Sequence, residues 1–330
     1  MRATIRIPAT SANLGSGFDT LGLALALYNE IVVEDEPATE NGRQLGAGPR
    51  IVITGEGADE LPRDGTNLIH RTVLRFFEML GRRPPPFSLA THNRIPLTGG
   101  LGSSSAALVG GLLAGNFLAG GPLSRDEILK VAFDEEGHPD NVAPALLGGL
   151  VLCVADDRRL TSVALPVPPD LRAVLFVPNF SMPTVEARRL LPSHVPHRDA
   201  VFNLGRAALL IAAFQTGRLD LLRIATEDRL HQPYRREMFP AMTRLMSAAQ
   251  QAGALAACLS GAGSALLALA RGREEQVAEA FRRAAERSGV VGRVFVVDVD
   301  RQGAQVDVEE VEAGDRVPVV TRQDAHRGSA

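Results

Sequence analysis

The stretch that decides the fold is PLTGGLGSSSAALVGG, residues 96–111, a glycine- and serine-rich turn that opens directly into a helical pattern. Gly99, Gly100 and Gly102 permit positive-φ backbone and the close approach of a ligand. Residues 103–105 are serines and stand where the helix begins, as cap or first-turn residues. Such a helix start directs backbone N–H groups and the positive end of the helix dipole toward an anion. The stretch therefore predicts a phosphate-binding loop.

An ordinary nucleotide-binding P-loop is excluded, because that loop needs a lysine directly after its last glycine. Ser103 occupies this position, and Lys130 is the only lysine among the 35 basic residues of the chain. Phosphates must therefore be held by backbone N–H groups, hydroxyls and a metal ion. Taken alone, a glycine-serine loop that merely caps a helix is an equally good interpretation, so other segments have to decide.

Three other segments favour the phosphate site: residues 5–34 with PATSANLGSGFD, residues 134–150 with EGHPDNVAP, and residues 258–270 with SGAG. Together with the loop, and in this order, they resemble the GHMP small-molecule kinases and, within them, the homoserine kinase branch. The resemblance covers most of the chain. Ser16 stands where the family usually has proline and Thr20 where it has serine. Neither side chain is expected to carry a chemical role.

The resemblance implies an α+β fold in two parts. Residues 1–168 would form a ribosomal protein S5 domain 2-like half, and residues 169–310 a ferredoxin-like half, with the active site between them. Residues 311–330 read as a polar, flexible tail. The pattern itself favours α+β, because strands and helices mix without a regular βαβ rhythm. Periodicity predicts strands at 2–7, 22–36, 51–54, 87–95, 148–156, 172–178 and 291–299, helices at 67–80, 124–136, 199–217, 218–231, 240–252 and 273–287, a strand–turn–strand unit at 255–270, and a loop or hairpin at 37–50.

The composition limits the class of protein. The chain is 45% hydrophobic with a net charge of −3, which gives no reason to expect nucleic acid or an anionic membrane as a partner. Cys153 and Cys258 are isolated in apolar surroundings, as is typical of buried free thiols in a cytoplasmic protein. The N-terminus has no apolar signal core, and no apolar run is long enough to span a bilayer. We therefore expect a soluble, cytoplasmic protein, and the resemblance implies a homodimer.

The resemblance implies ATP-dependent phosphorylation of L-homoserine to O-phospho-L-homoserine in threonine biosynthesis, with ATP and Mg²⁺ as cofactors. Asn67 would contact the adenine, although in isolation it reads as a helix N-cap. Ser104 and Glu136 are expected to bind the metal, because Mg²⁺ prefers hard oxygen ligands. Glu135 is the alternative acid, since spacing cannot choose between neighbours on a helix. The remaining ATP contacts would come from Pro96, Gly99, Gly100, Leu101, Gly102, Ser103, Ser104, Ser105 and Ala106.

An amino-acid substrate needs an anion clamp and an acceptor for its ammonium group. Arg188 and Arg235 stand where the family pattern has its carboxylate-binding arginines, and a guanidinium meets a carboxylate through two parallel hydrogen bonds. Asp19 would accept the ammonium group. Asn13 would hydrogen-bond the substrate, or act as a turn residue, or both. Thr184 and Gly261 are expected near the same pocket.

The segment Gly137–Asn141 would carry the phosphoryl-transfer chemistry. Asp140 and Asn141 are candidates for contacting the acceptor hydroxyl, and His138 for orienting them. Whether Asp140 acts as a general base stays open, because a loose transition state does not require early deprotonation of the hydroxyl. Two other functions also stay open: a different GHMP kinase acting on a small hydroxy-carboxylate, and a catalytically inactive binding protein of the same fold.

Overall fold

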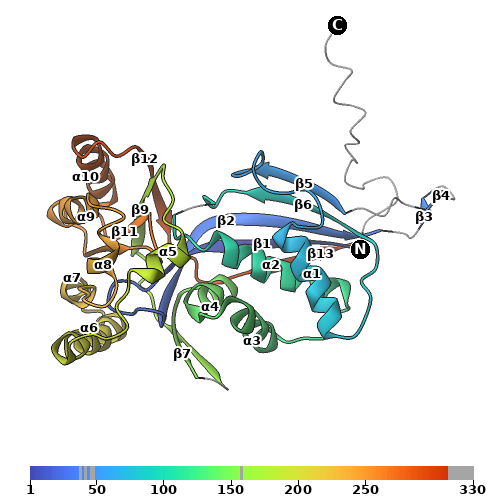
Figure 1. Ribbon diagram of the computed structural model, residues 1–330, viewed down its shortest axis with the longest axis horizontal. Helices are drawn as coiled ribbons and strands as arrows, with labels where there is room; N and C mark the ends of the chain where they lie inside the picture. Colours follow the sequence, from blue (N-terminus) through green and yellow to red (C-terminus); the bar gives the residue numbers. More distant parts are fainter. Residues whose placement is uncertain (37–38, 41–42, 45–48, 98, 157–158, 311–330) are drawn as a thin grey trace, which may run out of the picture.

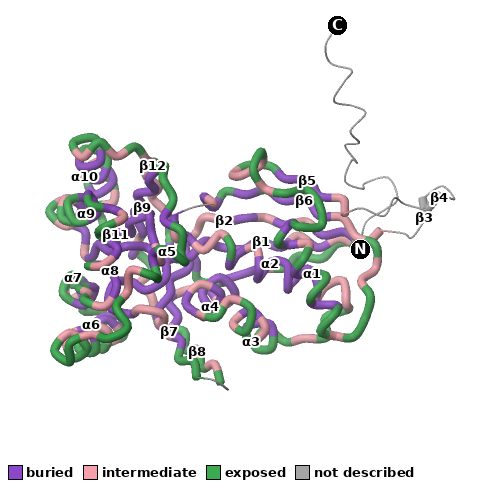
Figure 2. Tube along the Cα trace, viewed as in Figure 1, coloured by how far each residue is buried: buried purple, intermediate pink, exposed green. Residues whose placement is uncertain are grey.

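Two β-sheets with their helices form the two ends of an elongated molecule (Figure 1). The computed structural model describes residues 1–330 apart from 37–38, 41–42, 45–48, 98, 157–158 and 311–330. The tail expected at residues 311–330 lies outside the described residues. Buried residues concentrate in the strands of both sheets and in the helices that pack on them (Figure 2).

The larger sheet has seven strands in the order β13-β1-β2-β6-β5, with β7 beside β2 and β8 beside β7. β1 and β2 pair antiparallel, and the alternate residues Ala3, Ile5 and Ile7 of β1 are fully buried, because successive side chains of a strand face opposite ways. β5 and β6 are parallel. The strands are β1 (Arg2–Ala12), β2 (Leu21–Asp35), β5 (Arg50–Gly55), β6 (Phe87–Asn93), β7 (Leu150–Ala155), β8 (Leu160–Leu165) and β13 (Gln305–Glu309).

The helices between β5 and β7 lie along one side of this sheet (Figure 1), and α2 packs between the sheet and α1 at a distance that only glycine allows. A Cβ added to Gly110 would lie 2.3 Å from Cδ1 of Ile31 on β2, and one added to Gly111 would lie 2.6 Å from Cβ of Thr72 on α1. This close packing fixes where α2 begins, and hence where the phosphate loop lies. The helices are α1 (Leu68–Met79), α2 (Ser103–Leu118), α3 (Arg125–Glu136) and α4 (Pro139–Leu147).

The smaller sheet is entirely antiparallel, with the order β10-β11-β9-β12. Along the chain its elements run strand, helices, strand, strand, helix, strand, which is the ferredoxin-like arrangement implied by the resemblance. Val277 and Phe281 of α10 are fully buried, and Phe281 stacks on Phe176 of β9. The elements are β9 (Arg172–Pro178), β10 (Ala256–Leu259), β11 (Leu266–Ala270), β12 (Gly292–Asp298), α9 (Met242–Gln251) and α10 (Glu274–Arg287).

The segment between β9 and α9 differs from its prediction. The single helix expected over 218–231 is wrong, because the chain forms a 3₁₀ turn, a short helix and then a loop. That loop is fixed by the carboxylate of Asp228, which accepts hydrogen bonds from the backbone N–H groups of His231 and Gln232 at 3.1 and 2.7 Å. The elements here are α5 (Thr184–Arg189), α6 (His197–Thr216), η1 (Leu219–Leu221), α7 (Leu222–Ala225) and α8 (Gln232–Arg235).

Two strands of the larger sheet were not predicted, β8 and β13. β13 pairs with β1, from Arg2 opposite Glu309 to Arg6 opposite Gln305. The last strand of the expected second half, residues 169–310, therefore lies in the sheet of the first half. A separate ribbon of β3 (Thr39–Glu40) and β4 (Arg43–Gln44) falls within the expected hairpin region.

The two cysteines and the helices agree with the bulk properties of the sequence. Cys153 and Cys258 are both buried free thiols, as predicted. Burial raises the pKa of each thiol to about 12. Within the described part of the chain, no helix is long and apolar enough to cross a membrane.

Candidate active site

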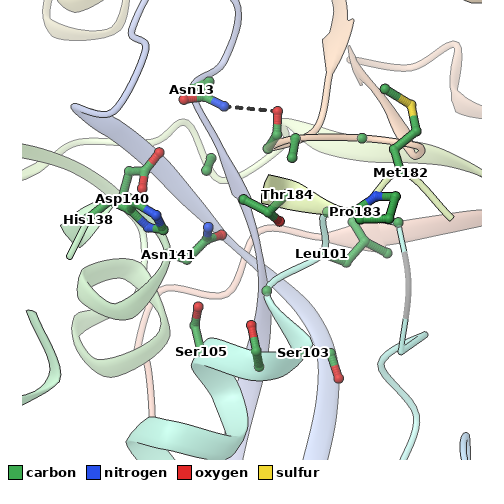
Figure 3. A pocket seen from close by; sticks show the side chains of 18 of the residues that line it. Asn13, Leu101, Ser103, Ser105, His138, Asp140, Asn141, Met182, Pro183 and Thr184 are labelled. Atoms are coloured by element: carbon green, nitrogen blue, oxygen red, sulfur yellow. Dashed lines mark hydrogen bonds between the residues drawn. The ribbon is translucent and has the colours of Figure 1, made fainter. Parts of the chain in front are cut away.

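A cavity of about 420 Å³ lies where loops of the two halves meet, and it contains most of the predicted site residues (Figure 3). Glu135, the alternative acid, also lines it. The cavity brings together residues from β1, α2, α4, α5 and α8, which are far apart in the sequence. The predicted residues that line it are Asn13, Asp19, Gly99, Gly100, Leu101, Gly102, Ser103, Ser104, Ser105, Glu136, His138, Asp140, Asn141, Thr184, Arg188, Arg235 and Gly261.

The floor of the cavity at one end is the start of α2. Gly99, Gly100 and Gly102 have φ values of 123°, 72° and 70°, a backbone that side chains rarely adopt. Gly102 is the N-cap and, lacking a side chain, makes no capping hydrogen bond. The N–H of Ala106 is the first that bonds within the helix, to the carbonyl of Gly102 at 2.8 Å. The N–H groups of residues 103–105 precede it and are oriented for an anion.

The glycine-serine loop rests on the turn between β10 and β11. The hydroxyl of Ser260 donates to the carbonyl of Gly100 at 2.7 Å, and the N–H of Ala265 donates to the carbonyl of Gly99 at 2.8 Å. A Cβ on Gly100 would lie 2.2 Å from the carbonyl oxygen of Ser260. The SGAG turn thus supports the loop, and the two halves of the molecule are joined directly at the site.

Two acids at the end of α3 face different partners. Glu136 accepts a hydrogen bond from the hydroxyl of Ser105 at 2.9 Å. Glu135 forms an ion pair with Arg75 on α1. The exposed Ser104 lines the cavity together with Glu136. The sequence predicted Ser104 as the metal-binding partner of Glu136. The hydroxyl that contacts the carboxylate of Glu136 in the structure is that of Ser105.

The metal-ligand chemistry of this corner suits Mg²⁺. Serine hydroxyls and the carboxylate of Glu136 are hard oxygen donors at the helix start where phosphates would bind. Among the described residues, no group of three or more His, Cys, Asp or Glu side chains could hold a metal ion. Mg²⁺ does not need such a group, because it binds through one or two carboxylates together with substrate phosphates and water.

The start of α4 presents three side chains to the cavity (Figure 3). Asp140 is only 3% exposed, and burial together with the charge of Asp19 raises the pKa of its carboxyl to about 7. Asn141 is held in place because its Oδ1 accepts from the hydroxyl of Thr10 on β1 at 2.7 Å. His138 is the N-cap residue but makes no capping bond through its side chain, which lies beside Asp140.

Asp19 and Arg188 form a two-pronged ion pair, with Nη1 and Nη2 of the arginine 2.8 and 2.9 Å from the carboxylate oxygens. The pair raises the pKa of Arg188 above its ordinary value. The sequence assigned these residues to oppositely charged groups of a substrate, and the structure pairs them with each other. Each remains partly exposed to solvent, at 32% and 41%.

Arg235 is a buried cation, 2% exposed, on the wall of the same cavity. Its Nη1 donates to the carbonyl of Gly261 at 2.9 Å, while its Nε is buried and has no partner within the described structure. No carboxylate of the described residues forms an ion pair with it. Burial and the charge of Arg188 lower the pKa of Arg235 to about 10. The carboxylates of Asp19, Asp228 and Asp140 act on Arg235 only from a distance, and a buried guanidinium without a direct ion pair can receive an anion.

The backbone between β1 and β2 is strained where it meets this wall. Asn13 and Asp19 have φ values of 73° and 55°, which are uncommon for residues other than glycine. Both polar atoms of the Asn13 amide are used, since Nδ2 donates to the carbonyl of Gly261 and Oδ1 accepts from the N–H of Asp19, each at 2.9 Å. Asn13 therefore acts as the turn residue of this segment and holds Asp19 and Gly261 in place.

Three predicted ATP-binding residues do not line the cavity. Asn67 is the N-cap of α1, where its Oδ1 accepts from two backbone N–H groups and its Nδ2 donates to the carbonyl of Pro62. This is the role that the residue indicates in isolation, and it engages both polar atoms of the side-chain amide. Pro96 lines a separate cavity beside Arg293. Ala106 is fully buried in the core, because it lies on the inner face of α2.

The sequence did not single out Phe18, His231 or Thr10, which lie directly behind the site. Phe18 has the guanidinium carbons of Arg188 and Arg235 each 5.5 Å from its ring centre. His231 contacts Arg235 from the preceding helical turn. Two of these residues could have been noticed in the sequence. Phe18 is within the GSGFD motif, and His231 precedes Arg235 by four residues, a spacing that places both on one helix face.

The chain matches the GHMP kinases N terminal domain over residues 67–149 and the GHMP kinases C terminal domain over residues 210–287. It is 46% identical to a homoserine kinase of Moorella thermoacetica over 87% of this chain and 93% of that protein. A homoserine kinase of a Synechocystis species is 41% identical, over 92% and 97% of the two chains.

Solved structures agree with these matches. The crystal structure of homoserine kinase from Cytophaga hutchinsonii superposes with a TM-score of 0.81 at 31% identity, covering 93% of this chain and 97% of that one. A mevalonate kinase of L. major, at 16% identity and a TM-score of 0.65, shares the fold. The expected fold and family are therefore confirmed, and the chain belongs to the homoserine kinases of the GHMP kinase family.

Proposed function

We propose that this chain transfers the γ-phosphoryl group of ATP to the hydroxyl of L-homoserine, producing O-phospho-L-homoserine for threonine biosynthesis. The observation that carries the proposal is the pairing of two anion sites in one cavity. One end is the uncapped start of α2, suited to phosphates, and the other is the buried Arg235 without a counter-ion. A substrate with a carboxylate at one end and a phosphoryl acceptor at the other fits between them.

The backbone N–H groups of residues 103–105 would hold the phosphates of ATP through the helix N-terminus. Ser104 and Glu136 would hold Mg²⁺, which, when bound, neutralises charge on the phosphates. The hydroxyl of Ser105 orients the carboxylate of Glu136 for this task. Glu135 is less suited, because its charge is already engaged by Arg75.

The zwitterionic end of the amino acid would bind to the three charged groups opposite. Arg235 and Arg188 would bind the carboxylate, and Asp19 the ammonium group, so that both members of the Asp19–Arg188 pair gain an opposite charge. Gly261 and Asn13 position these groups through their mutual hydrogen bond. Thr184, the first residue of α5, borders the same space.

Asp140 would accept the proton of the substrate hydroxyl as the phosphoryl group is transferred. Its pKa of about 7 suits this role, because a general base works best when its pKa lies near the operating pH. Asn141, fixed by Thr10, and His138 would orient the hydroxyl and the carboxyl of Asp140.

The alternatives are less favoured by the geometry. A kinase for a hydroxy-carboxylate without an ammonium group gives no role to Asp19, whose backbone is strained into place beside Arg188. An inactive binding protein gives no role to Glu136 and Asp140 at the phosphate end. A homodimer is proposed on the family resemblance alone, and a cytoplasmic location on the two buried free thiols.

The test is a coupled assay for ADP release, with purified protein, ATP and Mg²⁺, and homoserine, mevalonate or shikimate as acceptor. We expect turnover with homoserine and none above background with the other two. Turnover with mevalonate or shikimate but not homoserine would overturn the assignment. ATP binding without turnover of any acceptor would support the inactive binding protein.

A further inference from the structure

A fully buried histidine lies directly behind the proposed carboxylate-binding arginine. His231 is 0% exposed and is the N-cap residue of the short helix α8. Its Nε2 lies 2.8 Å from the carbonyl oxygen of Gly15, and its Nδ1 lies 2.9 Å from Nη1 of Arg235. The ring thus connects the strained segment between β1 and β2 to the guanidinium.

These two contacts fix the protonation of the ring. A guanidinium has only donors, so Nδ1 must accept and carries no proton. A carbonyl oxygen only accepts, so Nε2 must carry the proton. Only the neutral Nε2–H tautomer makes both contacts. A doubly protonated ring would place a proton on Nδ1, pointing at the N–H group of Arg235.

The surroundings of the ring favour the same state. The ring of Phe18 stacks on it at a centroid distance of 5.1 Å. Burial, together with the charge of Arg235, lowers the pKa of His231 to about 4, despite the nearby carboxylate of Asp228. That carboxylate is occupied by the backbone, since it accepts from the N–H groups of Leu230, His231 and Gln232 at 2.8, 3.1 and 2.7 Å.

The arginine depends on the histidine for its orientation. Nη1 of Arg235 donates both to Nδ1 of His231 and to the carbonyl of Gly261. With Nη1 engaged, Nη2 is the terminal donor left to serve a ligand, while Nε is buried and has no partner within the described structure. The side-chain amide of Gln232 anchors α8 itself, accepting from the N–H of Leu259 on β10 at 2.8 Å.

We propose that His231 is a positioning residue which, as the neutral Nε2–H tautomer, orients Arg235 to bind the carboxylate of the substrate. This inference rests on the proposed function of Arg235. It makes the Gly15–His231–Arg235 chain a part of substrate selection, although His231 itself does not touch the substrate.

Two conservative variants separate the two contacts. In His231→Asn, the side-chain oxygen can take the place of Nδ1 and accept from Arg235, while the donor to Gly15 is lost. In His231→Gln, the longer amide can donate to Gly15, while the acceptor for Arg235 is lost. A merely structural histidine would be damaged by both, so the pair is a matched control.

The first measurement is the KM for homoserine, the KM for ATP and kcat in the native enzyme and both variants. We expect His231→Gln to raise the KM for homoserine by about ten- to a hundredfold, as for a lost hydrogen bond to a charged group. The KM for ATP should stay unchanged, and His231→Asn should keep the native KM for homoserine. Equal increases in both variants, or a matching rise in the KM for ATP, would overturn the proposal.

The second measurement does not depend on activity. In ¹⁵N NMR of the full chain labelled at histidine, the His231 ring should show a protonated Nε2 and an unprotonated Nδ1 at neutral pH. A protonated Nδ1 contradicts the inference whatever the substrate is. If the native enzyme fails to phosphorylate homoserine, the proposed function fails, and the NMR result still decides whether His231 holds Arg235 as inferred.

Discussion

The two ends of the active-site cavity are built in different ways. The phosphate end is backbone, formed by consecutive residues of one glycine-serine loop and the start of α2. The substrate end is side chain, formed by Asp19, Arg188 and Arg235, which come from three distant segments and depend on hydrogen bonds between segments. A local sequence pattern can therefore be sufficient to predict the phosphate end, whereas the substrate end forms only when the folded chain brings its segments together. Substitutions at the two ends should fail in correspondingly different ways.

The largest effect is expected at Gly102, the residue on which the backbone end depends. A Cβ there would lie 2.0 Å from the hydroxyl of Thr10, at a φ of 70°. Gly102→Ala should therefore abolish ATP binding measured by calorimetry. It should also lower the melting temperature, since it disturbs the hydrogen bond from Thr10 to Asn141. The hydroxyl of Thr10 therefore leaves no room for a side chain at Gly102, whether or not a ligand is bound. The sequence around Gly102 indicated only the approach of a ligand.

Gly121→Ala is the matched control, because Gly121 has a φ of 73° and open space around its Cβ position. This variant carries only the backbone strain of about 1–2 kcal/mol. It should bind ATP normally. If Gly102→Ala and Gly121→Ala lose the same stability and both bind ATP, the loop does not approach phosphates closely.

Asp140→Asn should reduce kcat by about 10²- to 10⁴-fold, the usual contribution of a positioned general base. The native kcat/KM for homoserine should rise with pH through about 7, as the carboxyl of Asp140 loses its proton. The variant should show no inflection there. A native profile that is flat between pH 6 and 8, on the order of one unit either side of that pKa, would contradict a role for Asp140 in proton transfer.

Glu136→Gln should lower kcat by about 10²- to 10³-fold, with a smaller effect on homoserine binding, because the lost charge acts on the transferring phosphoryl group. Glu135→Gln is its control, since Glu135 is engaged by Arg75. Raised Mg²⁺ should partly restore Glu136→Gln by mass action. Should Glu135→Gln be the impaired variant instead, the metal assignment is wrong.

Arg188→Lys and Arg235→Lys should each raise the KM for homoserine by about ten- to a hundredfold and leave the KM for ATP unchanged. Charge is kept, but the planar donor pair that meets a carboxylate is lost.

Two substrate analogues sharpen the comparison. 3-Aminopropanol lacks the carboxylate and should not distinguish native enzyme from Arg235→Lys, while 4-hydroxybutanoate lacks the ammonium group and should be insensitive to Asp19→Asn. Phosphorylation of 3-aminopropanol as readily as homoserine would remove the physical basis of the clamp.

The backbone conformation at the start of α2 could be predicted from the sequence, whereas the contacts among the side chains opposite it could not, for a physical reason. Positive φ at Gly99, Gly100 and Gly102 follows from the residue type, and the helix start follows from its neighbours. The pairing of Asp19 with Arg188 depends on how the β1–β2 connection meets α5, which no local pattern contains.

The same distinction explains the errors in the fold. The helix expected over 218–231 ends early because a buried carboxylate, Asp228, takes up the backbone N–H groups that follow. β13 is a strand because β1 offers it a partner some 300 residues away, and its own pattern is short and polar. Tertiary partners, not local propensity, decide both regions.

The smallest effect in the native protein is expected in the pH dependence of stability, where Asp140 and His231 act in opposite directions. The pKa of His231 is lowered to about 4, so between that value and its unfolded value of about 6.5 only the unfolded chain binds the proton. This contribution to stability is complete above pH 6.5 and is lost as the pH falls toward 4. The pKa of Asp140 is raised to about 7, so between its unfolded value of about 4 and that value only the folded chain binds the proton, and stability is lost as the pH rises through this range.

Because the two slopes have opposite signs over the same window, they largely cancel in the native protein. Asp140→Asn removes the contribution of Asp140, so only that of His231 should remain. The free energy of unfolding should then rise with pH between 4 and 6.5, by up to about 1.4 kcal/mol per pH unit relative to native. In His231→Asn, only the contribution of Asp140 should remain, and the free energy of unfolding should fall as the pH rises over this range. Urea unfolding at a series of pH values measures both. Parallel curves for native and Asp140→Asn would show that the Asp140 carboxyl is not held protonated by its burial, and the case for Asp140 as the proton acceptor would then lose its electrostatic support.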